Sequence, residues 1–398
     1  MDAPFLQRKK GFGLSVEDTL KEWEEKSVLV LQGGGALGSY QAGAYSALHE
    51  AGYDPNWLAG ISIGSINAAI IAGNAPGDRV EKLREFWNLV SSNLQMPQLF
   101  FGTEGREIYN RMNAGLVAAW GVPGFFRPHN PFAFVNPFYP STNHKISRYD
   151  TTPLRNTLLD LIDFDRINNG DIRLSVGAVN VRSGNFIYFD SSKIEIKPEH
   201  IMASGALPDG FPPIEIDGEW YWDGGLVSNT PLQYVIDEQH HEGMCIFQVD
   251  LFSAEGEMPK DLFDVAKRIS DIRYSSRTRL NTEVFKQTQQ VRHTIARLLK
   301  EHPDQTVLND KELKLLKHWS CDSAITIAHL IYRQKEYEAH SKDYEFSRLS
   351  VIEHWQSGAD DVQFTLSQPE WINRKKPVDG VKVFDFKHKR KMHAEKPL

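Results

Sequence analysis

Cysteine is scarce in this sequence. Its 398 residues include only Cys245 and Cys321, which is too few for the disulfide framework of a small secreted protein. The first thirteen residues contain Arg8, Lys9 and Lys10 but no apolar run behind them, so we expect no signal peptide. Both observations favour a reducing, cytoplasmic location.

Long hydrophobic runs and an excess of positive charge are also missing. The most apolar stretch, residues 59–73, contains Ser62, Ser65 and Asn67 and is shorter than the roughly 20 apolar residues that span a bilayer. A net charge of −7 gives no general basis for nucleic-acid binding. We therefore expect a soluble protein without a nucleic-acid partner, whose contact with membranes, if any, is peripheral.

Apolar runs alternate with amphipathic segments along most of the chain. The hydrophobic share of 41% allows a large core, in one large domain with an appendage or in two domains. The alternation predicts an α/β fold, a three-layer sandwich with helices on both faces of a central, mostly parallel sheet. We expect strands over residues 27–32, 57–61, 173–181, 186–190, 219–222 and 244–250, and helices over 39–51, 63–72, 78–94, 153–162 and 231–239, with another near His200.

Changes in composition divide the chain into three parts. Residues 1–26 form an N-terminal segment with a short charged helix. Residues 27–255 form the main domain, with an insertion rich in aromatic residues and proline over 95–150. Residues 256–398 form a largely helical C-terminal region with a long helix over 262–300, a strand over 325–332 and a basic tail. The long helix is a candidate element for packing or for a homo-oligomer rather than for catalysis.

A serine stands where a predicted strand meets a predicted helix. Residues 60–64 read Gly60-Ile61-Ser62-Ile63-Gly64. Small residues on both sides allow a strained turn that exposes the hydroxyl of Ser62, as in the nucleophile elbow of serine hydrolases. The start of the following helix favours developing negative charge. A chance match to this short pattern is the competing interpretation.

A glycine-rich loop, residues 33–38 (Gly-Gly-Gly-Ala-Leu-Gly), joins the first strand to the next helix. A P-loop is nearly excluded because no Gly-Lys-Ser/Thr follows. A dinucleotide site would need an acidic residue at the end of the second strand, where this chain has Ser62. The loop fits better as an oxyanion hole, with the backbone N–H groups of Gly34 and Gly35 facing a tetrahedral intermediate. A purely structural turn is the remaining alternative.

The serine needs a proton acceptor, and Asp223 is the candidate. It follows the aromatic strand residues 220–222 and precedes Gly224 and Gly225. Burial beside aromatic rings would raise its pKa and make it a better base. The elbow follows only two strands, which disfavours the α/β-hydrolase order with a late histidine. Taken alone, an Asp-Gly pair is more often a turn.

Together these motifs resemble the patatin-like phospholipase family over roughly residues 25–255. They match in order: the glycine loop closed by Gly38, the elbow with Gly60 and Gly64, and the Asp-Gly-Gly motif. The segment Ala203-Ser204-Gly205-Ala206-Leu207-Pro208 also looks like the family's stretch before its aspartate. The resemblance implies a dyad of Ser62 and Asp223, an oxyanion hole of Gly33, Gly34 and Gly35, and lipid ester hydrolysis without metal or cofactor. Leu37 departs from the family, which often has Arg or Lys there, and this puts head-group preference in doubt.

Two further segments suggest contact with lipid. Residues 120–140 carry the aromatic side chains of Trp120, Phe125, Phe126, Phe132, Phe134, Phe138 and Tyr139, which fit a lid or lipid-docking surface as well as a self-packed loop. The tail contains Arg374, Lys375, Lys376, Lys382, Lys387, Lys389, Arg390 and Lys391. These could approach anionic head groups, although a solvated tail is the simpler interpretation.

We therefore expect a serine acyl hydrolase of the phospholipase A or lysophospholipase type. Three alternatives stay open: a non-catalytic lipid-binding or scaffolding protein on the same fold, a hydrolase of a storage polyester or thioester, and a nicotinamide-dependent oxidoreductase. Reaction of Ser62 with a fluorophosphonate probe would separate the first expectation from the non-catalytic one.

Overall fold

A mixed sheet of nine strands forms the centre of the protein in the computed structural model, which describes residues 25–91, 102–129, 146–238, 243–275, 278–302, 309–333, 335, 337–338 and 342–386. The strand order is β11-β10-β9-β1-β2-β5-β8-β7, with β6 paired to β5. The six strands from β11 to β5 run parallel, whereas β6, β7 and β8 join antiparallel. The strands are β1 (Lys26–Leu31), β2 (Trp57–Ile61), β5 (Arg173–Asn180), β6 (Phe186–Asp190), β7 (Ile214–Ile216), β8 (Glu219–Asp223), β9 (Met244–Asp250), β10 (Ile325–Ile331) and β11 (Val381–Phe384).

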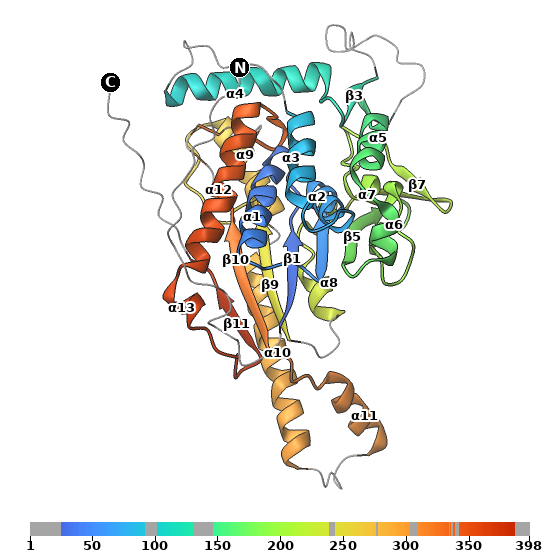
Figure 1. Cartoon of the computed structure of the whole chain (residues 1–398), viewed down its shortest axis with the longest axis vertical. Helices are drawn as coiled ribbons and strands as arrows, with labels where there is room; N and C mark the ends of the chain where they lie inside the picture. The colour runs from blue at the N-terminus through green and yellow to red at the C-terminus, as the bar shows by residue number, and fades with distance from the viewer. Residues whose placement is uncertain are drawn as a thin grey trace.

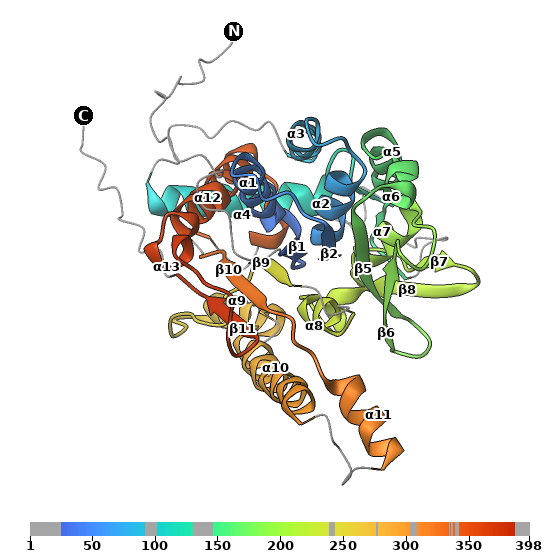
Figure 2. The ribbon, with the colours of Figure 1, turned by 60° about the horizontal axis from the view of Figure 1, so that its bottom comes forward.

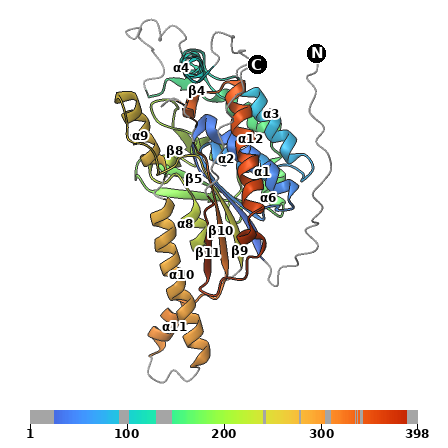
Figure 3. The same cartoon turned by 90° about the vertical axis from the view of Figure 1, so that its left-hand side faces the viewer.

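Helices cover both faces of this sheet, which makes three layers (Figures 1, 2 and 3). One layer contains α1 (Gly38–Glu50), α2 (Ile63–Ala72), α3 (Arg79–Leu89) and α12 (Arg348–Leu366). The opposite layer contains α8 (Leu232–Asp237), α9 (Leu262–Tyr274) and α10 (Thr278–Glu301), with α11 (Asp310–Trp319) beyond α10. Around the antiparallel side lie α5 (Thr152–Leu161), α6 (Phe164–Asn169) and α7 (Pro198–Ser204), and α13 (Pro369–Ile372) follows α12.

The helix α4 (Thr103–Trp120) belongs to neither layer and lies across one end of the molecule (Figures 1 and 3). A separate two-stranded ribbon, β3 (Arg127–Pro128) with β4 (Tyr149–Asp150), lies near its C-terminus. Three short 3₁₀ helices occupy the same end: η2 (Gly35–Leu37), η4 (Gly224–Leu226) and η5 (Lys342–Tyr344).

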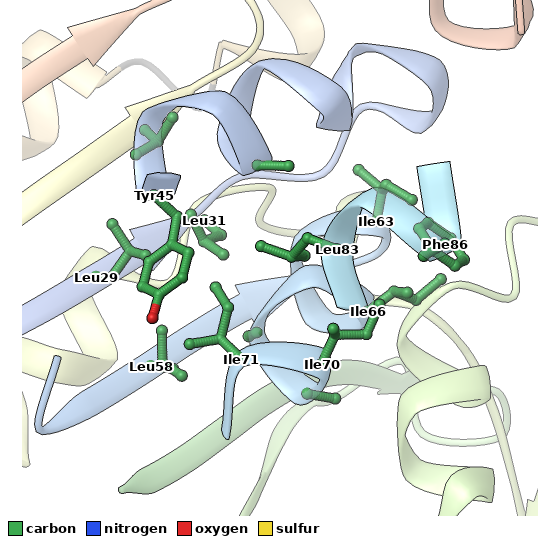
Figure 4. Packing of buried hydrophobic residues seen from close by; sticks show 14 of the residues in the cluster. Leu29, Leu31, Tyr45, Leu58, Ile63, Ile66, Ile70, Ile71, Leu83 and Phe86 are labelled. Atoms are coloured by element: carbon green, nitrogen blue, oxygen red, sulfur yellow. The ribbon is translucent and has the colours of Figure 1, made fainter. Parts of the chain in front are cut away.

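Alternation along the central strands builds two hydrophobic cores, because successive side chains of a strand point to opposite faces. Leu29 and Leu31 of β1 belong to a large cluster beneath α1, α2 and α3 (Figure 4). Val28 and Val30 face the other way, into a smaller cluster with residues of α8 and α10. A strand that is buried on both faces has an uninterrupted run of apolar residues. This explains why the sequence alone predicts a buried strand at β1.

The sheet crosses the domain boundary that the sequence predicted near residue 255. Parallel pairing of β10 with β9 and of β11 with β10 adds two C-terminal strands to the central sheet. Helix α12 packs closely on α1, since a β-carbon on Gly43 or on Gly358 would collide with the backbone of the other helix. The C-terminal region is therefore part of the same core and is less purely helical than expected.

The predicted α/β sandwich is confirmed, and β2 and α2 have the predicted limits. Leu83, Phe86 and Trp87 of α3 are buried. The helix predicted over 262–300 is wrong as one element, because α9 ends at Tyr274 and α10 begins at Thr278. The helix expected in the N-terminal segment lies outside the described residues, apart from its last two positions.

Candidate active site

Ser62 occupies a strained turn between β2 and α2. Its φ of 54° and ψ of −125° lie in a region that side-chain-bearing residues rarely adopt. The flanking glycines make this turn feasible, because a β-carbon on Gly60 would meet the backbone of Gly64, and one on Gly64 would meet the carbonyl of Leu31. The strand–turn–helix context predicted for the elbow is therefore present.

A second serine supports this turn from another element. The backbone N–H of Ser62 donates a hydrogen bond to Oγ of Ser204, 3.0 Å away at the end of α7, and Ser204 is fully buried. On the other side, the carbonyl of Ser62 accepts hydrogen bonds from the backbone N–H and the hydroxyl of Ser65. Both backbone groups of Ser62 are thus engaged, and its hydroxyl is left to face the cavity.

Asp223 lies at the end of β8 and lines the same cavity as Ser62. Its Oδ1 accepts a hydrogen bond from the N–H of Gly225 at 2.7 Å, and only 2% of the residue is exposed. Burial raises the pKa of its carboxyl to about 7, against the lowering effects of the nearby Ser62 hydroxyl and of the Gly225 N–H. Gly224 permits the close approach of this turn to β5, since a β-carbon there would meet the carbonyl of Gly177.

The glycine loop passes directly over Ser62. A β-carbon on Gly33 would lie 3.0 Å from the Cβ of Ser62. Asn229 holds this residue through two hydrogen bonds, from Gly33 N–H to its carbonyl at 3.2 Å and from its side-chain amide to the Gly33 carbonyl at 3.0 Å. The Gly33 N–H is therefore occupied. The N–H groups of Gly34 and Gly35 have no hydrogen-bond partner among the described residues, and they start the turn into η2 and α1.

Two other positions of this loop serve packing. Gly38 begins α1, where a β-carbon would collide with the side chains of Ile63 and Trp87. Leu37 is fully buried in the large core and does not line the cavity. A charge at this position would be enclosed by apolar side chains rather than offered to a substrate.

Ser62 and Asp223 open into a cavity of about 480 Å³, a size typical of single-ligand sites. Its walls are mostly apolar, and the residues that form them come from both the main domain (27–255) and the C-terminal region (256–398). Apolar and aromatic side chains that line it are Ile63, Ile66, Val117, Ala118, Phe125, Phe126, Tyr149, Leu207, Phe211, Phe252, Tyr274, Tyr344 and Phe346.

The charges around this cavity are unevenly distributed. Arg148 is the one cationic side chain among the described residues that line it, against the carboxylates of Asp209, Asp223 and Asp343. Asp343 belongs to η5, whose backbone packs on Gly35, and its Oδ1 is shielded without a hydrogen-bond partner among the described residues. Burial raises the pKa of Asp343 to about 6.

The structure places Ser62, Asp223 and the predicted loop glycines Gly33, Gly34 and Gly35 around one cavity. The predicted oxyanion-hole role of Gly33 is corrected, because its N–H is bonded to the carbonyl of Asn229. The sequence gives Ser204 only as part of a motif, and it gives no prediction for Asn229 or Asp343. Asn229 follows the Asp-Gly-Gly motif by a few residues, which is a weak signal. Nothing local indicates that it meets Gly33, 196 positions away.

The described aromatic residues of the insertion differ in their exposure to solvent. Phe125 and Phe126 are buried and line the cavity, whereas Trp120 is 70% exposed. Phe132, Phe134, Phe138 and Tyr139 lie outside the described residues. In the basic tail, Arg374 stacks on Trp371 and forms an ion pair with Glu25, and residues 387–391 lie outside the described residues.

The described part of the chain contains no group of three or more His, Cys, Asp or Glu side chains placed to hold a metal ion. Within the same residues, no helix combines the length and the apolar character needed to cross a bilayer.

Comparison with protein families identifies the class. The model described as "Patatin-like phospholipase" matches residues 29–236, and a second model, described as "Patatin phospholipase", matches residues 272–378. The chain belongs to the patatin-like phospholipase family and has the additional C-terminal region of the second model. The family supports a lipid-hydrolysing esterase in general terms. No curated protein sequence matches the chain.

Comparison with solved structures gives only distant similarities. VipD from Legionella pneumophila is 15% identical, with a TM-score of 0.37, and the match covers 86% of this chain and 67% of VipD. The type III effector protein ExoU is 11% identical, with a TM-score of 0.31, over 85% of this chain. The chain spans about half the length of ExoU, at 52% of that protein.

Proposed function

We propose that the protein is a carboxylic ester hydrolase that cleaves acyl groups from lipids, of the phospholipase A or lysophospholipase type, through a dyad of Ser62 and Asp223. One observation carries this proposal. A serine in strained backbone geometry shares one largely apolar cavity with a buried carboxylate whose pKa is raised to about 7 and is influenced by the serine hydroxyl.

In the first half-reaction, Asp223 accepts the hydroxyl proton of Ser62 while Oγ attacks the ester carbonyl carbon. The carbonyl oxygen becomes an oxyanion, which the N–H groups of Gly34 and Gly35 would stabilise together with the start of η2 and α1. Collapse of the tetrahedral intermediate breaks the ester C–O bond. The proton on Asp223 passes to the leaving alcohol, and the acyl group stays on Ser62.

In the second half-reaction, water replaces the alcohol. Asp223 takes a proton from this water while the water oxygen attacks the acyl carbonyl carbon. The N–H groups of Gly34 and Gly35 would again stabilise the oxyanion that forms. Collapse breaks the bond to Oγ, and the proton returns to Ser62 as the fatty acid leaves. A single carboxylate can serve both steps because its raised pKa lies near neutral pH, where it can both accept and donate a proton.

The lining of the cavity supports a lipid as the acyl donor. Aromatic side chains such as Phe125, Phe211 and Phe346 offer an apolar environment for an acyl chain. Arg148 is exposed and lines the same cavity, where it could meet a phosphate of the head group. Three carboxylates nearby would disfavour a strongly anionic substrate.

The test uses the purified protein, a fluorophosphonate probe and a p-nitrophenyl acyl ester. We expect Ser62 to be labelled, and we expect Ser62→Ala and Asp223→Asn each to lower kcat by about 10³-fold or more. Asp209→Asn, which removes an exposed carboxylate from the same cavity, is the matched control and should stay near wild type. Unlabelled Ser62 in a wild-type protein without esterase activity would instead favour a lipid-binding or scaffolding protein. Full activity of Ser62→Ala would assign the reaction to another nucleophile.

A further inference from the structure

Helix α4 exposes a row of apolar side chains along one side. Ile108, Met112, Leu116 and Trp120 follow one another at intervals of four residues, and they are 52%, 55%, 42% and 70% exposed. Side chains spaced in this way lie on the same side of a helix. We call these four side chains the α4 stripe.

Another side of α4 is held to the protein by both apolar and polar side chains, with Tyr109, Ala114 and Val117 buried there. Arg106 donates a hydrogen bond to the hydroxyl of Ser350 at 2.9 Å and forms an ion pair with Glu353 at 3.2 Å. The side-chain amide of Asn113 donates to Glu345 at 2.6 Å. A surface helix usually presents polar side chains on the side that faces solvent. Because α4 instead exposes four large apolar side chains beyond those that it buries, the stripe calls for an apolar partner.

The position of α4 connects this stripe with the proposed site. The helix lies across the end of the molecule at which β1, β2 and β9 terminate (Figures 1 and 3), and this is where Ser62 and the glycine loop are placed. Val117 and Ala118 of the same helix line the cavity. A substrate from a bilayer would therefore approach the end of the molecule that α4 covers.

Charge on α4 indicates which kind of surface would bind. The helix contains two Glu and two Arg, so its net charge is zero, and Arg111 is paired with Glu107. Insertion of apolar side chains, with a terminal tryptophan at the level of the head groups, would then drive binding rather than attraction to anionic lipids.

We infer that α4 is a membrane-docking helix, which lies in the interface of a lipid bilayer and inserts the α4 stripe among the head groups and upper acyl chains. This inference rests on the proposed function in so far as it explains how a lipid ester reaches Ser62. The docking itself does not require turnover, and the experiment separates the two.

The experiment measures sedimentation of the full chain with phosphatidylcholine vesicles, in a Ser62→Ala background so that no lipid is hydrolysed. Protein with an unchanged α4 should sediment with the vesicles at both low and high salt, because apolar insertion is not screened by salt. The triple substitution Ile108→Gln, Met112→Gln and Leu116→Gln should weaken partitioning by about 100-fold, or about fivefold for each half-exposed side chain.

A matched control lies at the other end of the molecule. Val284, Val291 and Leu298 of α10 are exposed to a similar degree, at 54%, 57% and 45%, and α10 lies far from α4 (Figure 1). Their triple substitution to Gln should leave sedimentation unchanged. In the active background, the α4 triple variant should hydrolyse a short, water-soluble ester at the wild-type rate, because none of its three residues lines the cavity.

Three results would overturn the inference. These are wild-type protein that stays in the supernatant, an α4 triple variant that sediments like wild type, and a wild-type dimer that the α4 substitutions dissociate. The last result would assign the stripe to a second copy of the chain. Vesicle binding without any esterase activity would instead keep the docking helix and remove the proposed function.

Discussion

The backbone N–H of Ser62 donates its hydrogen bond to Oγ of Ser204, across 142 positions of the chain. This contact stabilises the strained φ of Ser62. In Ser204→Ala the buried N–H loses its acceptor, which should destabilise the fold by about 1–3 kcal/mol and lower kcat on a soluble ester, since the hydroxyl of Ser62 is less well placed. Urea unfolding and steady-state kinetics would measure both effects.

Ser39→Ala is the control for this prediction. Ser39 is also fully buried, but its hydroxyl donates only to the Ala36 carbonyl of its own turn, at 3.4 Å. Loss of the Ser39 hydroxyl therefore breaks no hydrogen bond to a residue in strained geometry. If Ser39→Ala lost as much stability as Ser204→Ala, the contact with Ser62 would have no special role.

The raised pKa of Asp223 predicts how activity depends on pH. Below a pKa of about 7 the carboxyl is protonated and cannot accept the proton of Ser62. Activity on a soluble ester should therefore rise about tenfold per pH unit below this value and level off above it. A pH–rate profile that is flat between about pH 5 and 8 would contradict the role of Asp223 as base.

The same pKa predicts a change in stability. Since the folded-state pKa of Asp223 lies above its ordinary value of 3.8, its contribution to the free energy of unfolding is complete below the ordinary value and is lost as pH rises through about 7. Asp223→Asn removes this loss. As pH rises from about 4 to 8, the free energy of unfolding of the variant should increase relative to that of the wild type by on the order of 2–4 kcal/mol. Urea unfolding at each pH would measure this difference.

Gly35 should be sensitive to any side chain. Its φ is +55°, and a β-carbon would collide with the carbonyl of Asp343. Gly35→Ala should therefore displace the N–H that we propose as an oxyanion donor and lower kcat by about 10²–10³-fold. Gly52→Ala is the matched control, because Gly52 has a φ of +78° with open space around it. That substitution should cost some stability and leave kcat unchanged.

We expect that a positive charge at position 37 would not help catalysis. Because Leu37 is fully buried, Leu37→Arg should destabilise the fold by on the order of 3–5 kcal/mol without raising kcat. Leu37→Met, which keeps the volume and the apolar character, should cost about 1.5 kcal/mol or less. Thermal unfolding and kcat would be measured for both. An Arg variant that is stable and faster would show that a cation here serves catalysis.

The contact between α1 and α12 joins the C-terminal region to the core. Gly358→Ala would press a β-carbon onto the backbone of α1, and we expect a loss of about 1–3 kcal/mol or more in the free energy of unfolding. Gly115→Ala in α4, where nothing lies within 4 Å of the added carbon, should stabilise by about 0.5–1 kcal/mol. Equal effects of the two substitutions would contradict close packing of the helices.

The sequence by itself determined the local elements of the site. The apolar run of β2, the small residues around Ser62 and the apolar helix behind it predict the elbow, because periodicity and glycine geometry act within a few residues. The order of three short motifs then indicated the family, and the family model matches accordingly.

Only the tertiary structure decided which distant groups complete this site. Asn229 occupies the N–H of Gly33, Ser204 supports Ser62, and η5 brings Asp343 from the C-terminal region against Gly35. The same is true of β10 and β11, which extend the sheet past the expected boundary. These contacts depend on strand order and on the packing of segments far apart in the chain, and no local pattern of residues encodes them.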